Sequence, residues 1–364
     1  MAAKGGAKGP EPAASDGAIT FEDLGIPTGT GGMVRTPVGQ RRSLKDVTTL
    51  EWIFLVLSTL SILVVSALTI FRLVELIRDS KSNVAQTTQT PTPSASASSE
   101  ASDNETDTVF AILLLFNAVY ILFYVLNGVF GERANELLIF VAGICIVLVY
   151  CIINYLQQGS TSHAVKLARL ILISAAGPVL GIMALYIAYR YYDSRNLIFR
   201  TVGANIELQD MCQYMFLCES LLKFDFQLEV SIVILVLDDL SSISLFETLI
   251  ICFGVTYGMI WAVVGFLSMR YENKHLTWIF FATSVFEPAY IIFKIVRVAQ
   301  DFDPHNSSMQ LLNYAIIVCS VLGLLVRVAV VLCMSKVYSN FGKGLKEKAF
   351  GDEGDGDTQP FRSS

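Results

Sequence analysis

The sequence predicts an all-helical membrane protein, a polytopic bundle of about eight transmembrane helices. Of its 364 residues, 53% are hydrophobic and 16% are charged, and the mean hydropathy is +0.56. A water-soluble fold cannot expose so many apolar side chains, which indicates lipid as the main solvent. Apolar stretches of about 20 residues, the length that crosses about 30 Å of hydrocarbon, recur along the chain.

The arm before the first apolar stretch is predicted to be disordered and cytosolic. Residues 1–48 are rich in Gly, Pro, Ala and small polar side chains with no apolar period, so they bury too little surface to offset the chain entropy. They contain no apolar core of a signal peptide, and their acidic residues argue against a transit peptide. We therefore expect the first apolar stretch to act as an uncleaved signal anchor.

The membrane bundle is predicted over residues 49–335. Its spans are expected at 51–71, 109–130, 137–156, 167–188, 216–237, 243–269, 276–298 and 309–333. The fifth span contains four charged residues, Glu219, Lys223, Asp225 and Glu229. It either crosses as a long tilted helix that begins near Asn205 or lies as an amphipathic helix on the inner leaflet.

Two segments outside the hydrocarbon have their own composition. Residues 80–108 contain a Ser, Thr and Pro run that resembles mucin-like stalks, and they are predicted to form a flexible outer loop. Residues 336–364 begin basic and end in the acidic run GDEGDGD, which is typical of a disordered cytosolic tail.

Charge and glycosylation sequons indicate the orientation. Lys and Arg concentrate in the loops that share a side with the termini, which predicts that both termini are cytosolic. The sequons at Asn104 and Asn306 fall in predicted outer loops, where glycosylation takes place. An even number of spans separates them, which favours a fifth segment that crosses. We expect a multi-pass protein of the plasma membrane or an endomembrane.

The absence of several motifs argues against an enzyme. The histidines His163, His275 and His305 all lie in predicted loops, so no histidine-based metal site is expected at membrane depth. The sequence contains no G-x-x-x-x-G-K-[ST] phosphate loop and no G-x-S-x-G nucleophile elbow. No cofactor, metal or nucleic-acid partner is predicted.

The block RTVGANIELQD at residues 200–210 resembles a segment of uncharacterised eukaryotic multi-pass membrane proteins. This resemblance covers a small part of the chain and implies no activity.

Small residues and prolines mark special positions within the spans. The G-x-x-x-G patterns at 177–181 and 254–258 predict close helix packing, either within one bundle or between two copies of the chain. Pro178 and Pro288 lie near the middle of the fourth and seventh spans, where each removes a helix hydrogen bond and forms a candidate hinge. Equivalent prolines would fit inverted three-helix repeats, as in some secondary transporters.

Ionisable residues within the spans are the candidate functional groups, because a charge in hydrocarbon is costly without a partner. Estimated depths pair Asp225 with Arg327 in the inner third of the membrane and Glu247 with Lys294 in the outer third. These pairs serve either to fix the helix register or to take part in transport. Glu229 and Glu287 remain near the middle with no base at their level, so either one of them holds a proton or the pair shares a cation. The alternative is that each glutamate is protonated and hydrogen-bonds to a neighbouring Ser, Thr or Asn.

These residues predict passage or sensing of a small cation or solute through a cavity between spans five to eight. The expected partners are the lipid bilayer and that cation or solute, with the chain either a monomer or a homo-oligomer. The alternative is a receptor-like or scaffolding protein that acts through its cytosolic termini.

Overall fold

The computed structural model describes residues 34–36, 39–41, 47–87, 95–157, 163–236, 245–300 and 307–346. The chain divides into two units, Met1–Asp46 and Val47–Ser364. In the first unit, strands β1 (Val34–Thr36) and β2 (Gly39–Arg41) pair antiparallel. This hairpin lies in the arm that the sequence predicts to be disordered, and residues 1–33, 37–38 and 42–46 of the arm lie outside the described residues.

The described part of the second unit is helical, which confirms the predicted fold class. Its helices are α1 (Thr49–Thr87), α2 (Ala95–Phe130), α3 (Ala134–Gln157), α4 (His163–Ser194), α5 (Asn196–Val202), α6 (Ile206–Val236), α7 (Leu245–Tyr271), α8 (Lys274–Thr283), α9 (Phe286–Gln300) and α10 (Ser307–Ser339).

Local capping explains where several helices begin. At the start of α1, the Thr48 backbone N–H donates to Glu51 Oε2 at 2.7 Å, as in a capping box. The Asn205 side chain accepts from the backbone N–H groups of the first turn of α6, and Asn273 does the same for α8. Asn205 is the residue near which the sequence predicts the fifth span to begin.

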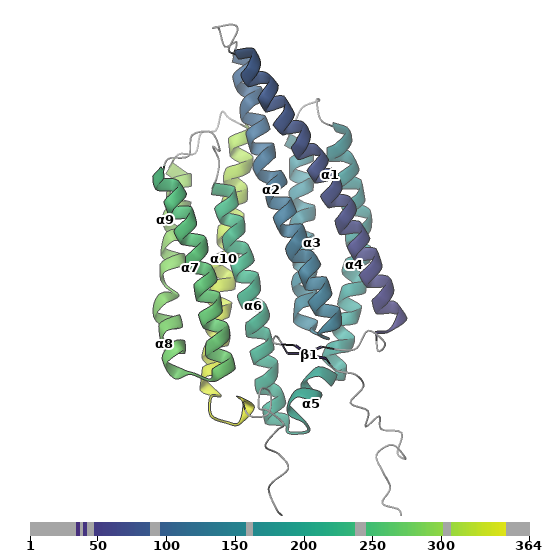
Figure 1. The fold of residues 1–364 in the computed structure, drawn as a ribbon, viewed down its shortest axis with the longest axis vertical. Coiled ribbons are helices and arrows are strands. Elements are labelled where there is room, and N and C mark those ends of the chain that lie inside the picture. The colour runs from purple at the N-terminus through teal and green to yellow at the C-terminus, as the bar shows by residue number, and fades with distance from the viewer. Residues whose placement is uncertain are drawn as a thin grey trace, which may run out of the picture. The chain divides into compact units, whose positions relative to one another are not determined.

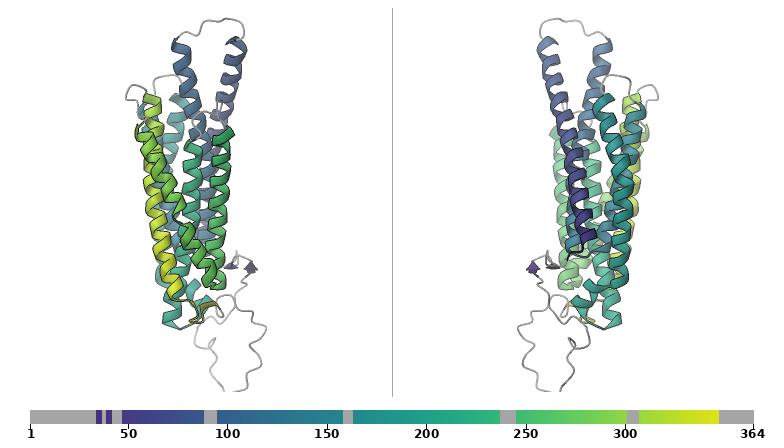
Figure 2. Two further views of the ribbon diagram at one scale, coloured as in Figure 1. Left: turned by 90° about the vertical axis from the view of Figure 1, so that its left-hand side faces the viewer. Right: turned by 90° about the vertical axis from the view of Figure 1, so that its right-hand side faces the viewer.

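The long helices run side by side along one direction, and the short α5 lies at the end where α1 begins (Figures 1 and 2). Helices α1 to α4 contact one another in one group, and α6 contacts α7 and α10 in a second group. α1 begins and α10 ends at the same end of the bundle (Figure 1). An even number of crossings accounts for this arrangement.

Helix α6 joins the two groups, because it contacts α2 and α3 on one side and α7 and α10 on the other. Among the described residues, seven segments are long and apolar enough to cross a membrane, and α6 is not one of them. Three of its acids, Glu219, Asp225 and Glu229, are instead buried against neighbouring helices. With 31 residues at about 1.5 Å each, α6 is long enough to be the eighth span.

The seventh predicted span is broken into α8 and α9 at Ser284 and Val285. The break lies just before Pro288, whose ring clashes with the carbonyl of the residue four positions earlier. The hydroxyls of Thr283 and Ser284 donate to carbonyls of the last turn of α8, so side chains replace part of the interrupted backbone ladder. The candidate hinge at Pro288 therefore coincides with a real discontinuity.

Pro178 differs, because α4 continues through it as one helix. Its neighbour Gly177 lies against α3, where an added Cβ would come 3.2 Å from Ile144. Close packing at the first G-x-x-x-G pattern thus involves Gly177, whereas a Cβ at Gly181 would meet nothing within 4 Å. The two prolines do not occupy equivalent structures, which gives no support to an inverted repeat.

The segment predicted to be a flexible outer loop is largely helical. α1 continues to Thr87 and α2 begins at Ala95, so helix covers most of the 80–108 segment. Helix propagation adds one hydrogen bond for each residue fixed, and it extends these helices beyond their apolar stretches. Asn104 falls in α2, and Asn306 lies outside the described residues, so glycosylation of both stays a prediction. The predicted tail also begins later, because α10 continues to Ser339.

Candidate functional site

The centre of the candidate site is Arg327, which α10 places among three helices. Its side chain is 2% exposed, and its Nη2 lies 3.0 Å from Asp225 Oδ2 on α6. The pair predicted from estimated depth is therefore present in the structure. Arg327 Nη2 also contacts Glu287 Oε2 at the start of α9.

The contact with Glu287 corrects one expectation. The sequence predicted no base at the level of Glu287 and Glu229, because depth was estimated from Cα positions alone. An arginine side chain is long enough to place its charged head well away from its own Cα. Arg327 thus meets carboxylates from two helices.

Glu229 lies one turn after Asp225 on α6 and is 7% exposed. It packs against Gly258 of α7, where an added Cβ would overlap the Glu229 carboxylate. The second G-x-x-x-G pattern thus makes room for an acid at Gly258. At Gly254 an added Cβ would meet nothing within 4 Å.

A cavity of about 80 Å³ adjoins this cluster, and Glu229, Glu287, Gly254 and Tyr290 line it. Glu229 Oε2 is buried and has no hydrogen-bond partner among the described residues. Most of its wall is apolar, with Ile232, Val233 and Ile291 beside the two carboxylates, and a cavity of this size has room for a water molecule. The structure therefore brings Glu229 and Glu287, which the sequence predicts near the middle of the membrane, to one small cavity.

Aromatic residues of α7 close the other side of Arg327. The guanidinium carbon lies 3.7 Å from the centroid of the Trp261 ring, a cation–π geometry that favours the charged form. Trp261 stacks on Phe280 and its Nε1 donates to the Phe280 carbonyl at 3.2 Å. The Tyr257 hydroxyl donates to the carbonyl of Thr283.

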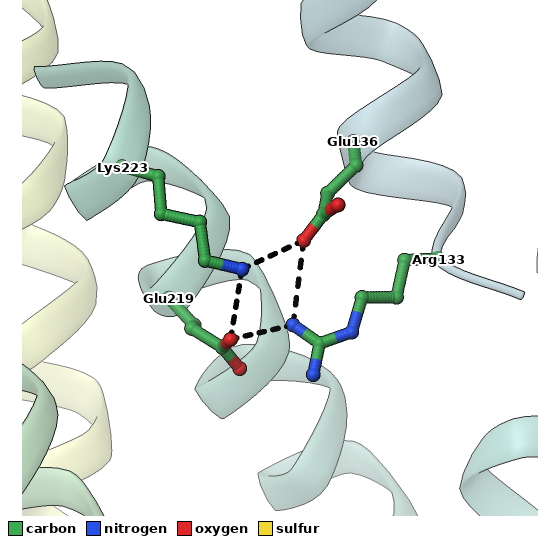
Figure 3. A network of polar contacts seen from close by, with 4 residues as sticks. All are labelled: Arg133, Glu136, Glu219 and Lys223. Atoms are coloured by element: carbon green, nitrogen blue, oxygen red, sulfur yellow. Dashed lines mark hydrogen bonds and ion pairs between the residues drawn. The ribbon is translucent and has the colours of Figure 1, made fainter. Parts of the chain in front are cut away.

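A second charge cluster, the α3–α6 network, lies nearer the end of the bundle where α1 begins. It consists of Arg133, Glu136, Glu219 and Lys223 (Figure 3). Lys223 Nζ lies 2.8 Å from Glu136 Oε1 and 2.9 Å from Glu219 Oε1. Arg133 Nη1 lies 2.6 Å from the same Glu219 oxygen and 3.4 Å from Glu136 Oε1. Two bases thus neutralise two acids across the interface.

The surroundings keep Arg133 charged. Arg133 precedes α3, and burial would lower the pKa of its guanidinium; Glu219 and Glu136 outweigh that effect and raise the pKa above its usual value. Glu136 is fully buried in the first turn of α3, where the positive end of the helix dipole favours an acid. The network therefore joins α3 to α6 with charged partners.

Polar residues also link α6 to α2. Gln227 Nε2 donates to Asn117 Oδ1 at 2.6 Å, and the Ser231 hydroxyl donates to the Gln227 carbonyl at 2.8 Å. α6 thus presents two polar faces. One follows Glu219, Lys223 and Gln227 at intervals of four residues, and the other contains Asp225 and Glu229.

The structure does not decide the remaining candidates. Glu247 and Lys294 lie in α7 and α9, but their side chains are outside the described set, so their pairing stays a prediction.

In the described part of the chain, no group of three or more His, Cys, Asp or Glu is arranged to hold a metal ion. The α3–α6 network and the role of Trp261 were missed from the sequence, although the spacing of Glu219 and Lys223 suits an ion pair.

A family model described as Domain of unknown function (DUF7789) matches residues 95–189 and 202–336. No curated protein and no solved structure matches the chain. The matched residues include every member of the Arg327 cluster and of the α3–α6 network.

Proposed function

The chain belongs to the family described as Domain of unknown function (DUF7789), a description that names no activity, so we propose its function from the buried charges. The protein transports a small cation, the proton included, across the membrane. Asp225, Glu229 and Glu287 form the binding site, and Arg327 acts as its internal counter-ion. No enzymatic activity is part of this function.

The observation that supports this proposal most strongly is the position of Glu229. It is a buried carboxylate beside a small, mostly apolar cavity, with one oxygen that lacks a hydrogen-bond partner among the described residues. Arg327 already contacts Asp225 and Glu287, and one guanidinium cannot neutralise three carboxylates. An unpaired charge at membrane depth is costly, so Glu229 holds a proton or a small cation.

The same geometry supports an exchange mechanism. When the proton or cation leaves Glu229, the carboxylate attracts the Arg327 guanidinium, which lies on the neighbouring helix. When it returns, Arg327 goes back to Asp225 and Glu287. A ligand can shift a protein between two states only if it interacts differently with them. Here the two states differ in the carboxylates that Arg327 contacts.

The break between α8 and α9 gives the site a movable wall. Glu287 lies in the first turn of α9, and discontinuous helices at mid-membrane are a feature of transporter binding sites. Hydrogen bonds from Trp261 and Tyr257 to carbonyls of α8 hold the break against α7. A rotation of α9 about Ser284 would move Glu287 relative to Arg327.

We propose that both termini are cytosolic and that the α3–α6 network lies at the cytosolic end of the site. Epitope tags at either terminus should be detected only after cells are permeabilised, because the basic loops share the side of the termini. A tag inserted within residues 88–94 should be detected on intact cells or in the lumen of vesicles. A C-terminal tag on the same side as the 88–94 tag would contradict this orientation.

A flux experiment tests the transport function. Purified protein in liposomes should conduct protons or one of Na⁺ and K⁺ down an imposed gradient, as reported by a trapped pH- or cation-sensitive dye. Glu229→Gln should fold and lose at least about 90% of the flux, because the amide cannot exchange a proton and binds a cation weakly. Glu287→Gln should lose less, because it also weakens a contact of Arg327.

Glu207→Gln is the matched control, since Glu207 lies on the same helix and is exposed. Its flux should equal that of the unchanged protein. The transport function is wrong if the flux of the unchanged protein and that of the control are both no higher than the flux of protein-free liposomes. That outcome would favour the alternative, a receptor-like or scaffolding protein that acts through its termini.

A further inference from the structure

A groove on the surface of the protein, between α2, α6 and α7, is separate from the cavity beside Glu229 and Glu287. Its volume is about 520 Å³, compared with about 80 Å³ beside Glu229. We refer to it as the α2–α6–α7 groove. α2 contributes Val119 and Phe123, α6 contributes Lys223 and Phe226, and α7 contributes residues from Met259 to Phe266.

The walls of the groove are apolar and open toward the surrounding lipid. Val119 is 67% exposed, and Met259 and Val263 are 51% and 50% exposed. In a chain that spans a membrane, such exposed apolar side chains face hydrocarbon. An occupant that enters from this side and fits these walls is itself a hydrocarbon chain.

One end of the groove is polar. Lys223 and Glu219 of the α3–α6 network form this end, and the Lys223 side chain is 23% exposed. Lys223 Nζ lies over the Phe123 ring at 5.7 Å from its centroid. Ion pairs with Glu136 and Glu219 account for two of the three N–H donors of the ammonium group, so one donor is available at the groove.

The polar end also lies at the level of a membrane interface. Lys223 bonds Glu136 in the first turn of α3, directly after the α2–α3 turn. The groove extends from there toward the middle of α2, at Val119. A polar head at the interface with an apolar tail toward the bilayer centre is the arrangement of a lipid in one leaflet.

We propose that the α2–α6–α7 groove is a binding site for one anionic phospholipid, with an acyl chain along the groove and its phosphate at Lys223. The apolar walls select the chain, and the free N–H donor of Lys223 selects the anionic head by a charge-assisted hydrogen bond. Because Lys223 also bonds Glu136 and Glu219, the lipid headgroup shares its ammonium group with the contact between α3 and α6. This site does not depend on the transport function.

Filling the groove tests the acyl-chain site. Protein reconstituted in nanodiscs of equal phosphatidylglycerol and phosphatidylcholine should retain one phosphatidylglycerol per chain in native mass spectrometry. Val263→Trp should reduce the retained lipid at least about tenfold, because the indole occupies the groove. Val328→Trp on α10 is the matched control, as Val328 is 57% exposed and does not line the groove.

Changing the polar end tests the headgroup preference. Lys223→Gln should retain a lipid but lower the preference for phosphatidylglycerol about fivefold, the effect of one basic group at a membrane surface. Lys223→Arg should keep that preference. Equal retention by Val263→Trp and Val328→Trp would overturn the site, whether or not Lys223→Gln folds. An unchanged headgroup preference in a folded Lys223→Gln would overturn the role of Lys223.

Discussion

Arg327→Ala is expected to destabilise the bundle by about 3 to 5 kcal/mol, the cost of removing one partner from a buried ion pair. The change leaves Asp225 and Glu287 without the guanidinium that contacts both of them. It also removes the cation from the face of Trp261. The free energy of unfolding, measured by titrating SDS into detergent micelles, checks this value.

Removing the stranded acids should recover stability. Arg327→Met combined with Asp225→Leu and Glu287→Leu replaces the ion cluster by apolar side chains, a change that is often neutral or stabilising in buried sites. The combined variant should therefore be more stable than Arg327→Met alone. If the combined variant changes the free energy of unfolding by the sum of the three single changes, the residues are not coupled. That result would contradict the contacts of Arg327 with Asp225 and Glu287.

Gly258→Ala is the second substitution with a large expected effect. An added Cβ at Gly258 overlaps the Glu229 carboxylate, so Glu229 must leave its place beside the cavity. Overpacking of this kind costs about 1 to 3 kcal/mol, and the displaced carboxylate should also lower the flux. Thermal unfolding in micelles and the liposome assay measure the two effects.

A partner substitution and a control separate this clash from a general effect of alanine in α7. The variant that combines Gly258→Ala with Glu229→Ala should lose less unfolding free energy than the two single variants lose together, because the overlap is then absent. Gly254→Ala lies one turn earlier, where an added Cβ meets nothing within 4 Å. It should change the free energy of unfolding by no more than about 0.5 kcal/mol. If Gly254→Ala and Gly258→Ala lose equal unfolding free energy, the Glu229 carboxylate does not lie against Gly258.

The fold follows closely from the sequence where the spans are apolar. Long hydrophobic runs predict seven of the membrane-spanning segments, because helices satisfy their backbone hydrogen bonds in hydrocarbon without a partner. α6 was harder to predict, since its charged residues resemble an interfacial helix. The structure resolves this by covering Glu219, Asp225 and Glu229 with neighbouring helices, which is a property of the tertiary structure.

The site is predicted in part. Estimated depth was sufficient to pair Asp225 with Arg327, because both lie on helices whose direction alternates regularly. Depth gives no information on the direction in which a side chain points around its helix, so the contact of Arg327 with Glu287 was missed. The α3–α6 network was missed for a related reason, because Glu136 and Lys223 are far apart in the sequence and meet only through packing.

The most direct measurement for the proposed mechanism is charge movement at Glu229. Proteoliposomes on a solid-supported membrane can be exposed to a rapid jump in pH or in cation concentration while the capacitive current is recorded. We expect a transient current in the unchanged protein and in Glu207→Gln, and none in Glu229→Gln. An undiminished current in folded Glu229→Gln would contradict a mechanism in which this carboxylate exchanges a proton or a small cation.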